Sequence, residues 1–142
     1  MAVDISVAAR DAACNAIVDL VDGGAGAGHL FIRSGTQPAT PATADSGTLL
    51  ADITLQDPAF DISGSGGGNA DGESVLLGVP LSDTSADGTG TAGHFRIKDS
   101  NSVVIFQGSC GQGSGDISFD NASIVATGTV TITALSVTVP MN

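Results

Sequence analysis

Apolar and polar residues alternate along most of the chain, a pattern typical of β-strands that bury one face. The alternation is clearest over residues 48–56, where Leu49, Ala51, Ile53 and Leu55 share one side. It recurs in other segments, at 29–33, 75–81, 93–98, 103–107 and 129–139. Runs rich in Gly, Asp, Ser and Pro separate these segments and predict turns. The pattern predicts a mainly β fold, a β-sandwich or barrel-like domain of six to eight strands with one N-terminal α-helix.

Residues 5–22 have the spacing of a helix. Polar residues recur at intervals of three or four and predict one solvated side: Asp11, Asn15, Asp19 and Asp22. The opposite side is apolar and shallow: Ala9, Ala13, Ala16, Ile17 and Leu20. Asp4 or Ser6 is placed to cap the first turn, and the glycine-rich residues 23–28 end the helix. We therefore expect a helix and hinge over 1–27 and a β domain over 28–142, within a single domain overall.

Composition limits the partners that this chain can have. The 142 residues include 15 acidic and 4 basic side chains, for a formal net charge of −11. Nucleic acids and anionic membranes require clustered Lys and Arg, so neither partner is expected. Trp and Tyr are absent, which counts against an aromatic platform for bases or sugars. The sequence has no secretory leader and no apolar run of about 20 residues, so we expect a soluble protein made in the cytoplasm.

Residues suited to catalysis or metal binding are few. His29 and His94 are the two histidines, and no G-x-S-x-G nucleophile motif accompanies them. A Cys110–His94 pair is the one conceivable nucleophilic arrangement, and we expect no enzyme activity and no cofactor. Weak calcium candidates alternate in a glycine-rich segment at Asn69, Asp71 and Glu73. They do not complete a known calcium loop, so a solvated turn is the alternative.

Two further groups of residues leave alternatives open. Arg33, Arg96 and Lys98 lie in two segments of similar sequence, 28–33 and 93–98. They are candidates either for pairing with carboxylates of the same chain or for an interface with a partner. Cys14 and Cys110 show no metal-ligand spacing. They are expected as two buried thiols, and a possible disulfide between them or between chains is the alternative.

Three stretches together resemble small virion structural proteins of tailed bacteriophages. The first is Thr48–Leu55 with Asp57–Phe60, the second is Gly93–Ser100 with Val104–Gly108, and the third is Asp116–Asn121 leading into Gly128–Ile132. The resemblance implies a capsid decoration (cement) protein on the head surface of the virion, made in the host bacterial cytoplasm. The implied partners are the major capsid protein and copies of the chain itself, as a dimer or trimer. No catalytic residue is carried over by it.

A cement protein needs arms that reach neighbouring subunits, and two segments are candidates for this role. One is the N-terminal helix with its glycine hinge, and the other is the loop 34–47, rich in Pro, Thr and Ala. Two other functions stay open at this point. One is a tail, neck or fibre component of the same virion, and the other is a carbohydrate-binding β-module.

Overall fold

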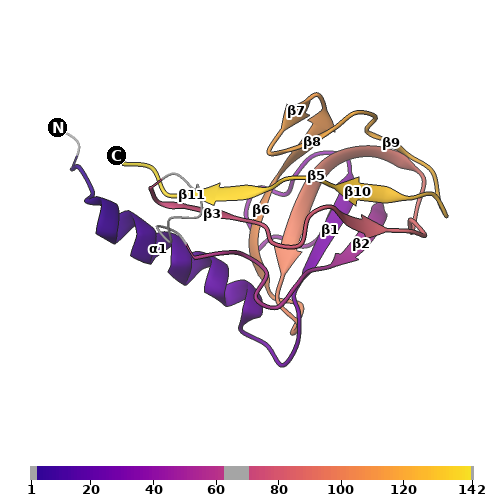
Figure 1. Cartoon of the computed structure of the whole chain (residues 1–142). Helices are drawn as coiled ribbons and strands as arrows, with labels where there is room; N and C mark the ends of the chain where they lie inside the picture. Colours follow the sequence, from indigo (N-terminus) through magenta and orange to yellow (C-terminus); the bar gives the residue numbers. More distant parts are fainter. Residues whose placement is uncertain (1–2, 63–70, 142) are drawn as a thin grey trace.

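Strands dominate the structure, a computed structural model that describes residues 3–62 and 71–141 (Figure 1). These residues contain one α-helix, α1 (Val7–Asp19), and a 3-10 turn, Leu20–Asp22, continues it. The longer strands are β1 (His29–Ser34), β2 (Leu49–Thr54), β5 (Gly90–Lys98) and β6 (Val104–Gln112). The short strands are β3 (Glu73–Val75), β4 (Leu81–Asp83), β7 (Ser114–Gly115), β8 (Ile117–Phe119), β9 (Ser123–Ile124), β10 (Val130–Ile132) and β11 (Ser136–Thr138).

The main sheet has seven strands, and its central order is β2-β1-β5-β6-β7. These neighbours are antiparallel, while β8 runs parallel to β6 and β9 pairs with β5. Two small antiparallel sheets, β10-β4 and β11-β3, lie outside it. The predicted mainly β fold with one N-terminal helix is confirmed, and its sheets are not closed into a barrel. The described residues hold more strands than predicted, for two reasons. The strands β7 and β9 lie in segments without a predicted strand and are too short to show a period. The segments 75–81 and 129–139 were each predicted as one strand, and this was wrong: the chain turns within each of them, so that they are divided between β3 and β4 and between β10 and β11.

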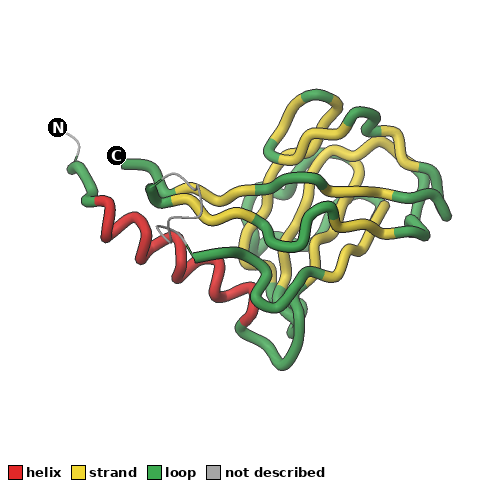
Figure 2. Tube along the Cα trace, in the orientation of Figure 1, coloured by secondary structure: helices red, strands yellow, loops and turns green. Residues whose placement is uncertain are grey.

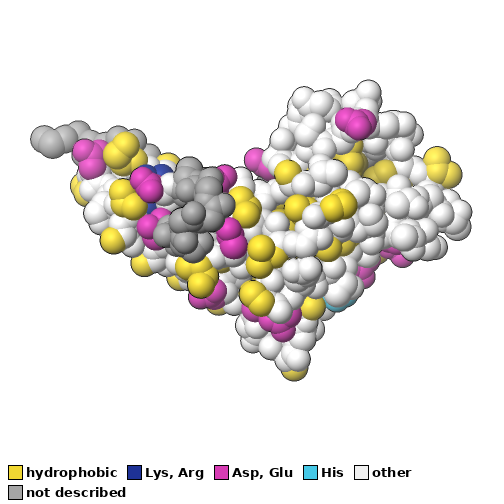
Figure 3. Space-filling view, viewed as in Figure 1, with side chains coloured by type: hydrophobic (Ala, Val, Ile, Leu, Met, Phe, Trp, Pro, Cys, Tyr) yellow, Lys and Arg dark blue, Asp and Glu magenta, His cyan; other side chains and the backbone are white. Residues whose placement is uncertain are grey.

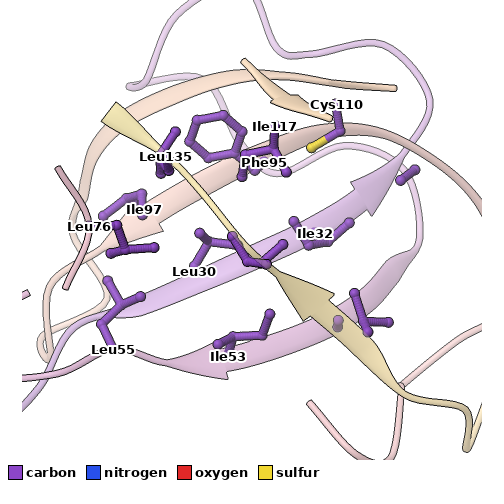
Figure 4. Close-up of a cluster of buried hydrophobic side chains, with 14 of the residues drawn as sticks. Leu30, Ile32, Ile53, Leu55, Leu76, Phe95, Ile97, Cys110, Ile117 and Leu135 are labelled. Atoms are coloured by element: carbon purple, nitrogen blue, oxygen red, sulfur yellow. The ribbon is translucent and has the colours of Figure 1, made fainter. Parts of the chain in front are cut away.

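The core lies between the main sheet and the chain that crosses it through β10 and β11 (Figure 4). Alternation places Leu30, Ile32, Phe95 and Ile97 on the same face, and antiparallel pairing sets Leu30 opposite Ile97 and Ile32 opposite Phe95. All four are at most 2% exposed. Leu76, Val130, Ile132 and Leu135 close the core from the other side. Burial of these alternating apolar positions is the main source of stability.

The helix and the β11-β3 ribbon form a lobe that projects from the main sheet (Figures 1 and 2). We call residues 3–22 together with β3 and β11 the projecting lobe. Polar contacts hold it together: the Arg10 guanidinium donates from Nε to Val139 O (2.9 Å) and from Nη2 to Asp71 O (2.6 Å). Asp11 Oδ1 accepts the amide of Gly72 at 2.7 Å. At the helix start, Ser6 Oγ caps the amide of Ala9 at 3.3 Å.

The predicted sides of the helix were wrong. Its buried side carries Cys14, Val18 and Val21, whereas Ile17 and Leu20 are 36% and 57% exposed. Arg10, Asp11 and Asp22 are half-buried. They form hydrogen bonds with backbone groups of Val139, Gly72 and Ala59, which would otherwise lack partners. The helix therefore docks through a partly polar side and leaves its alanine-rich side exposed.

We expect Ile97→Ala to lower the free energy of unfolding by about 2–5 kcal/mol, because its fully buried side chain would leave a cavity. Urea denaturation followed by circular dichroism measures the change. The matched control is Val103→Ala, at a valine that is 55% exposed, with an expected effect of at most about 0.5 kcal/mol. Equal effects of the two variants would contradict this placement of the core.

Candidate interaction surface

Three cations meet at one carboxylate on the sheet face opposite the core. Arg33 comes from β1, and Arg96 and Lys98 from alternate positions of β5. Asp45 accepts from Arg96 Nη1 at 2.5 Å and from Lys98 Nζ at 2.8 Å, and Arg33 Nη1 lies 3.7 Å from it. Of the two alternatives for these cations, pairing within the chain describes the geometry. A role in an interface stays a prediction for Arg33 and Lys98, while Arg96 is only 1% exposed.

Arg96 also fastens the loop 35–47 across this face, and we call that loop the strap. Its Nη2 donates to three strap carbonyls, those of Thr40, Pro41 and Thr43, at 3.2, 3.0 and 2.8 Å. Its Nε donates to Gln107 Oε1 at 3.0 Å. Gln107 Nε2 in turn donates to Pro38 O at 2.6 Å. The segment considered as an arm for neighbouring subunits is thus packed on its own sheet.

Asp45 is ionised over a wide pH range because of these contacts. Partial burial alone would raise the pKa of Asp45, but hydrogen bonds from Lys98 and Arg96 outweigh it and lower this pKa from 3.8 to about 2. Asp45 was not identified from the sequence as a site residue. The sequence did contain a feature that points to Asp45. It is the one charged residue in 34–47, and three cations on one sheet face require a carboxylate partner.

The two histidines have different surroundings. His29 Nδ1 lies 2.6 Å from Asp52 Oδ1. The His29 ring stacks on the Phe31 ring, with 5.8 Å between the ring centroids. The same Phe31 ring lies 5.0 Å from Lys98 Nζ. His94 is fully buried, with Nδ1 at 3.1 Å from Gly35 O and with Nε2 lacking a partner among the described residues. Both histidines therefore lie on the face that the strap partly covers.

The conceivable Cys110–His94 pair does not form. His94 is opposite Ser109 across the β5-β6 ladder, and Cys110, the next residue, points to the core face. Burial, with a smaller contribution from the charge of Asp116, raises the pKa of the Cys110 thiol to about 12. A buried neutral thiol is a poor nucleophile. Cys14 is also buried and lies near Ser74 Oγ and Val137 O, at 3.4 and 3.3 Å, and both cysteines are free.

The calcium candidates are not brought together as a site. Asn69 lies outside the described residues. The carbonyl of Asp71 accepts from Arg10, and Glu73 pairs with Thr138 in the β11-β3 ribbon. No group of three His, Cys, Asp or Glu side chains within 3–62 and 71–141 could hold a metal ion.

The projecting lobe carries much of the exposed apolar surface (Figure 3). Five of the ten large apolar side chains exposed in the described part of the chain belong to it: Val3, Ile5, Val7, Ile17 and Leu20. Two hollows, of about 300 and 380 Å³, lie where the lobe joins the sheet and share Asp116, Leu135 and Ser136. No helix of the described residues is long and apolar enough to cross a membrane.

We expect Asp45→Asn to lower the free energy of unfolding at pH 7 by about 1–3 kcal/mol, since charge-assisted hydrogen bonds are lost. The pKa of Asp45 is lower in the folded chain than in the unfolded chain. Its stabilisation is therefore complete above the unfolded value of 3.8 and disappears as the pH falls towards 2. Urea denaturation at several pH values should show wild type and variant converging in acid. Asp120→Asn, at an exposed aspartate after β8, is the control, and a pH-independent difference would contradict the role of the Asp45 charge.

Neither cysteine should react with a thiol reagent in the native protein at pH 8, because both are buried and Cys110 has a raised pKa. Both should react once the chain is unfolded in urea. Intact-mass spectrometry after brief alkylation counts the modified thiols. A reductant-sensitive change in mass or gel mobility would instead establish a disulfide.

Comparisons with known proteins do not place the chain in a family. No family model matches it, and neither does any curated protein or solved structure. The resemblance to phage virion proteins stays a prediction, and the function is argued below from the residues and geometry of this chain.

Proposed function

We propose that this protein is a bacteriophage virion structural protein, a capsid decoration protein that binds the outer head shell. Its partners are the major capsid protein and further copies of itself. The observation that carries the proposal is the projecting lobe, which presents exposed apolar side chains away from the core of the sheet. Exposed apolar groups that gather on one element are typical of protein interaction sites.

The rest of the molecule suits a structural role. The strap is fastened to the outer sheet face by a buried arginine with five hydrogen-bonded groups around it. Such a network holds the loop in one position. The sheet is then a firm base from which the lobe projects, as a protein that bridges or covers subunits requires.

Weak contacts are sufficient in a shell. Burying one exposed Val, Leu or Ile side chain contributes about 1.5–3 kcal/mol, and ordering the interface cancels part of this gain. A few such residues give modest affinity for a single copy. Copies that also contact one another bind cooperatively, because each bound copy raises the effective concentration of the next.

Purified protein should bind shells of the major capsid protein that lack it, up to a fixed number of copies per shell. Co-sedimentation with quantitative gel densitometry measures this number. Leu20→Asp should reduce binding at least tenfold, because it would place a charge in the contact with the shell. Since Leu20 is exposed, the substitution should leave the folded structure intact. Val125→Asp, at a valine that is 63% exposed away from the lobe, should bind as wild type does.

Immunogold labelling of intact particles distinguishes a head decoration protein from a tail, neck or fibre component. Dense label over the head would support decoration. Label restricted to the tail or neck would move the assignment to a tail, neck or fibre component. Absence of label and of shell binding would reject the virion proposal.

A polar hollow favours carbohydrate binding as a second candidate function. Its volume is about 450 Å³, and hydroxyl, amide and carboxylate side chains line much of it, among them Ser118, Asp120, Asn121 and Thr131. Such groups can hydrogen-bond sugar hydroxyls. Glycan-array binding by wild type that is lost in Asn121→Ala would support this function, and an array without signal would dismiss it.

A further inference from the structure

The outer edge of β6 has no strand partner over most of its length in the described part of the chain. On one side, β6 pairs with β5 from Val104 to Ser109. Beyond Ser109, β7 pairs with Cys110 and Gly111, and β8 pairs with the segment from Cys110 to Gln112. Within residues 3–62 and 71–141, no strand continues the sheet beyond the edge from Val104 to Ser109.

Backbone groups on this edge point away from β5. The amide of Ser109 donates to Asp116 Oδ2 at 2.8 Å rather than to β5. Because the direction of backbone groups alternates along an antiparallel strand, the N–H and C=O of Gln107 point to the same side. The opposite edge of the sheet differs, since Asp83 Oδ2 accepts the amide of Asp52 and the amide of Asp87 donates to Leu50 O.

An apolar groove follows the open edge. The 300 Å³ hollow is lined by Phe106, Gln107 and Gly108 of β6, by Ile17 and Val137 of the lobe, and by the core residue Leu135. Phe95 contributes to it and meets the Phe106 ring edge-on, with 6.4 Å between ring centroids. Figure 3 shows the surface indented where lobe and sheet meet. An open edge beside an apolar groove is the arrangement that accepts an added strand, with main-chain hydrogen bonds from the edge and pockets for alternate side chains.

We propose that this groove receives residues Val3–Ser6 of a second copy, added as a strand to the β6 edge. In this segment Val3 and Ile5 alternate with Asp4 and Ser6, and the two apolar residues are 82% and 41% exposed. Its backbone is already extended at Ser6, with φ −62° and ψ 155°. Four residues at about 3.3 Å each span roughly 13 Å, the length of Val104–Gln107 on the edge.

The side chains also fit this occupant. In an added strand, Val3 and Ile5 face the groove floor while Asp4 and Ser6 face away from it. Asp116 and Glu73 lie on the walls of the two hollows, so an inward carboxylate would be repelled and an inward apolar residue would not. In its own chain the segment makes a hydrogen bond from Ile5 N to Met141 O, 3.0 Å long, and the exchange replaces this bond with bonds to the β6 edge.

This inference deepens the proposed function, because it names a contact through which copies in a decoration layer would bind one another. It rests on that function only for its biological setting.

The first test is a cross-link between two different chains. A mass-tagged Ile5→Cys copy is mixed with a Ser136→Cys copy and oxidised, and non-reducing gels are read for the tagged mixed dimer. Ser136 is exposed and lines both hollows. We expect the mixed dimer to form at least tenfold more than with a Ser123→Cys copy, whose serine is exposed on β9.

The second test is the solution state of the full chain by sedimentation velocity. Wild type should associate, and Ile5→Asp should weaken that association at least tenfold while Val125→Asp leaves it unchanged. A wild-type chain that stays monomeric up to about 1 mM, or equal cross-linking at Ser136→Cys and Ser123→Cys, would overturn the proposal. Shell binding is measured separately with Leu20→Asp, so a failed strand exchange and a failed capsid assignment give different results.

Discussion

The buried guanidinium of Arg96 is the interaction on which the outer half of the structure depends. A charge that is 1% exposed is tolerated only with hydrogen-bonding partners and an opposing charge. The strap supplies both, through three carbonyls and Asp45. The loop is therefore held in place by polar side chains of the sheet, with Arg96 making the most of these bonds, beside Gln107 and Arg33. Its own sequence has no apolar residues larger than proline to bury.

The same principle shapes the projecting lobe. Its helix is rich in alanine, and burial of alanine contributes little per residue. Arg10 and Asp11 instead satisfy backbone groups of the ribbon, which turns the alanine-rich side and Leu20 outward. The exposed apolar surface thus follows from how the helix is fastened, and the helix sequence alone does not reveal it.

The net negative charge limits how copies of this chain can contact one another. A net charge of −11 keeps separate copies apart at low ionic strength, while the few cations are engaged within the chain at Asp45, Val139 and Asp71. In the proposed association of copies, attraction therefore comes from apolar contacts and backbone hydrogen bonds. The lobe offers exposed apolar side chains, and the β6 edge offers backbone groups without a strand partner in the described part of the chain.

The sequence predicted the alternating strands of the main sheet, a helix cap at Asp4 or Ser6 and the turn-rich, mainly β class, because these depend on local periodicity and on side chains a few residues apart. It also left two alternatives for Arg33, Arg96 and Lys98, which were pairing with carboxylates of the same chain and an interface with a partner. The tertiary structure alone decided that Arg96 turns to Asp45, 51 residues away, that Cys110 and His94 lie on opposite faces, and that the helix docks through Arg10 and Asp11. The pairing of Arg96 and the docking of the helix depend on which distant groups the fold brings together, and the separation of Cys110 from His94 depends on the β5-β6 register. The sequence offered Asp45 as a carboxylate, but only the fold brings it to Arg96.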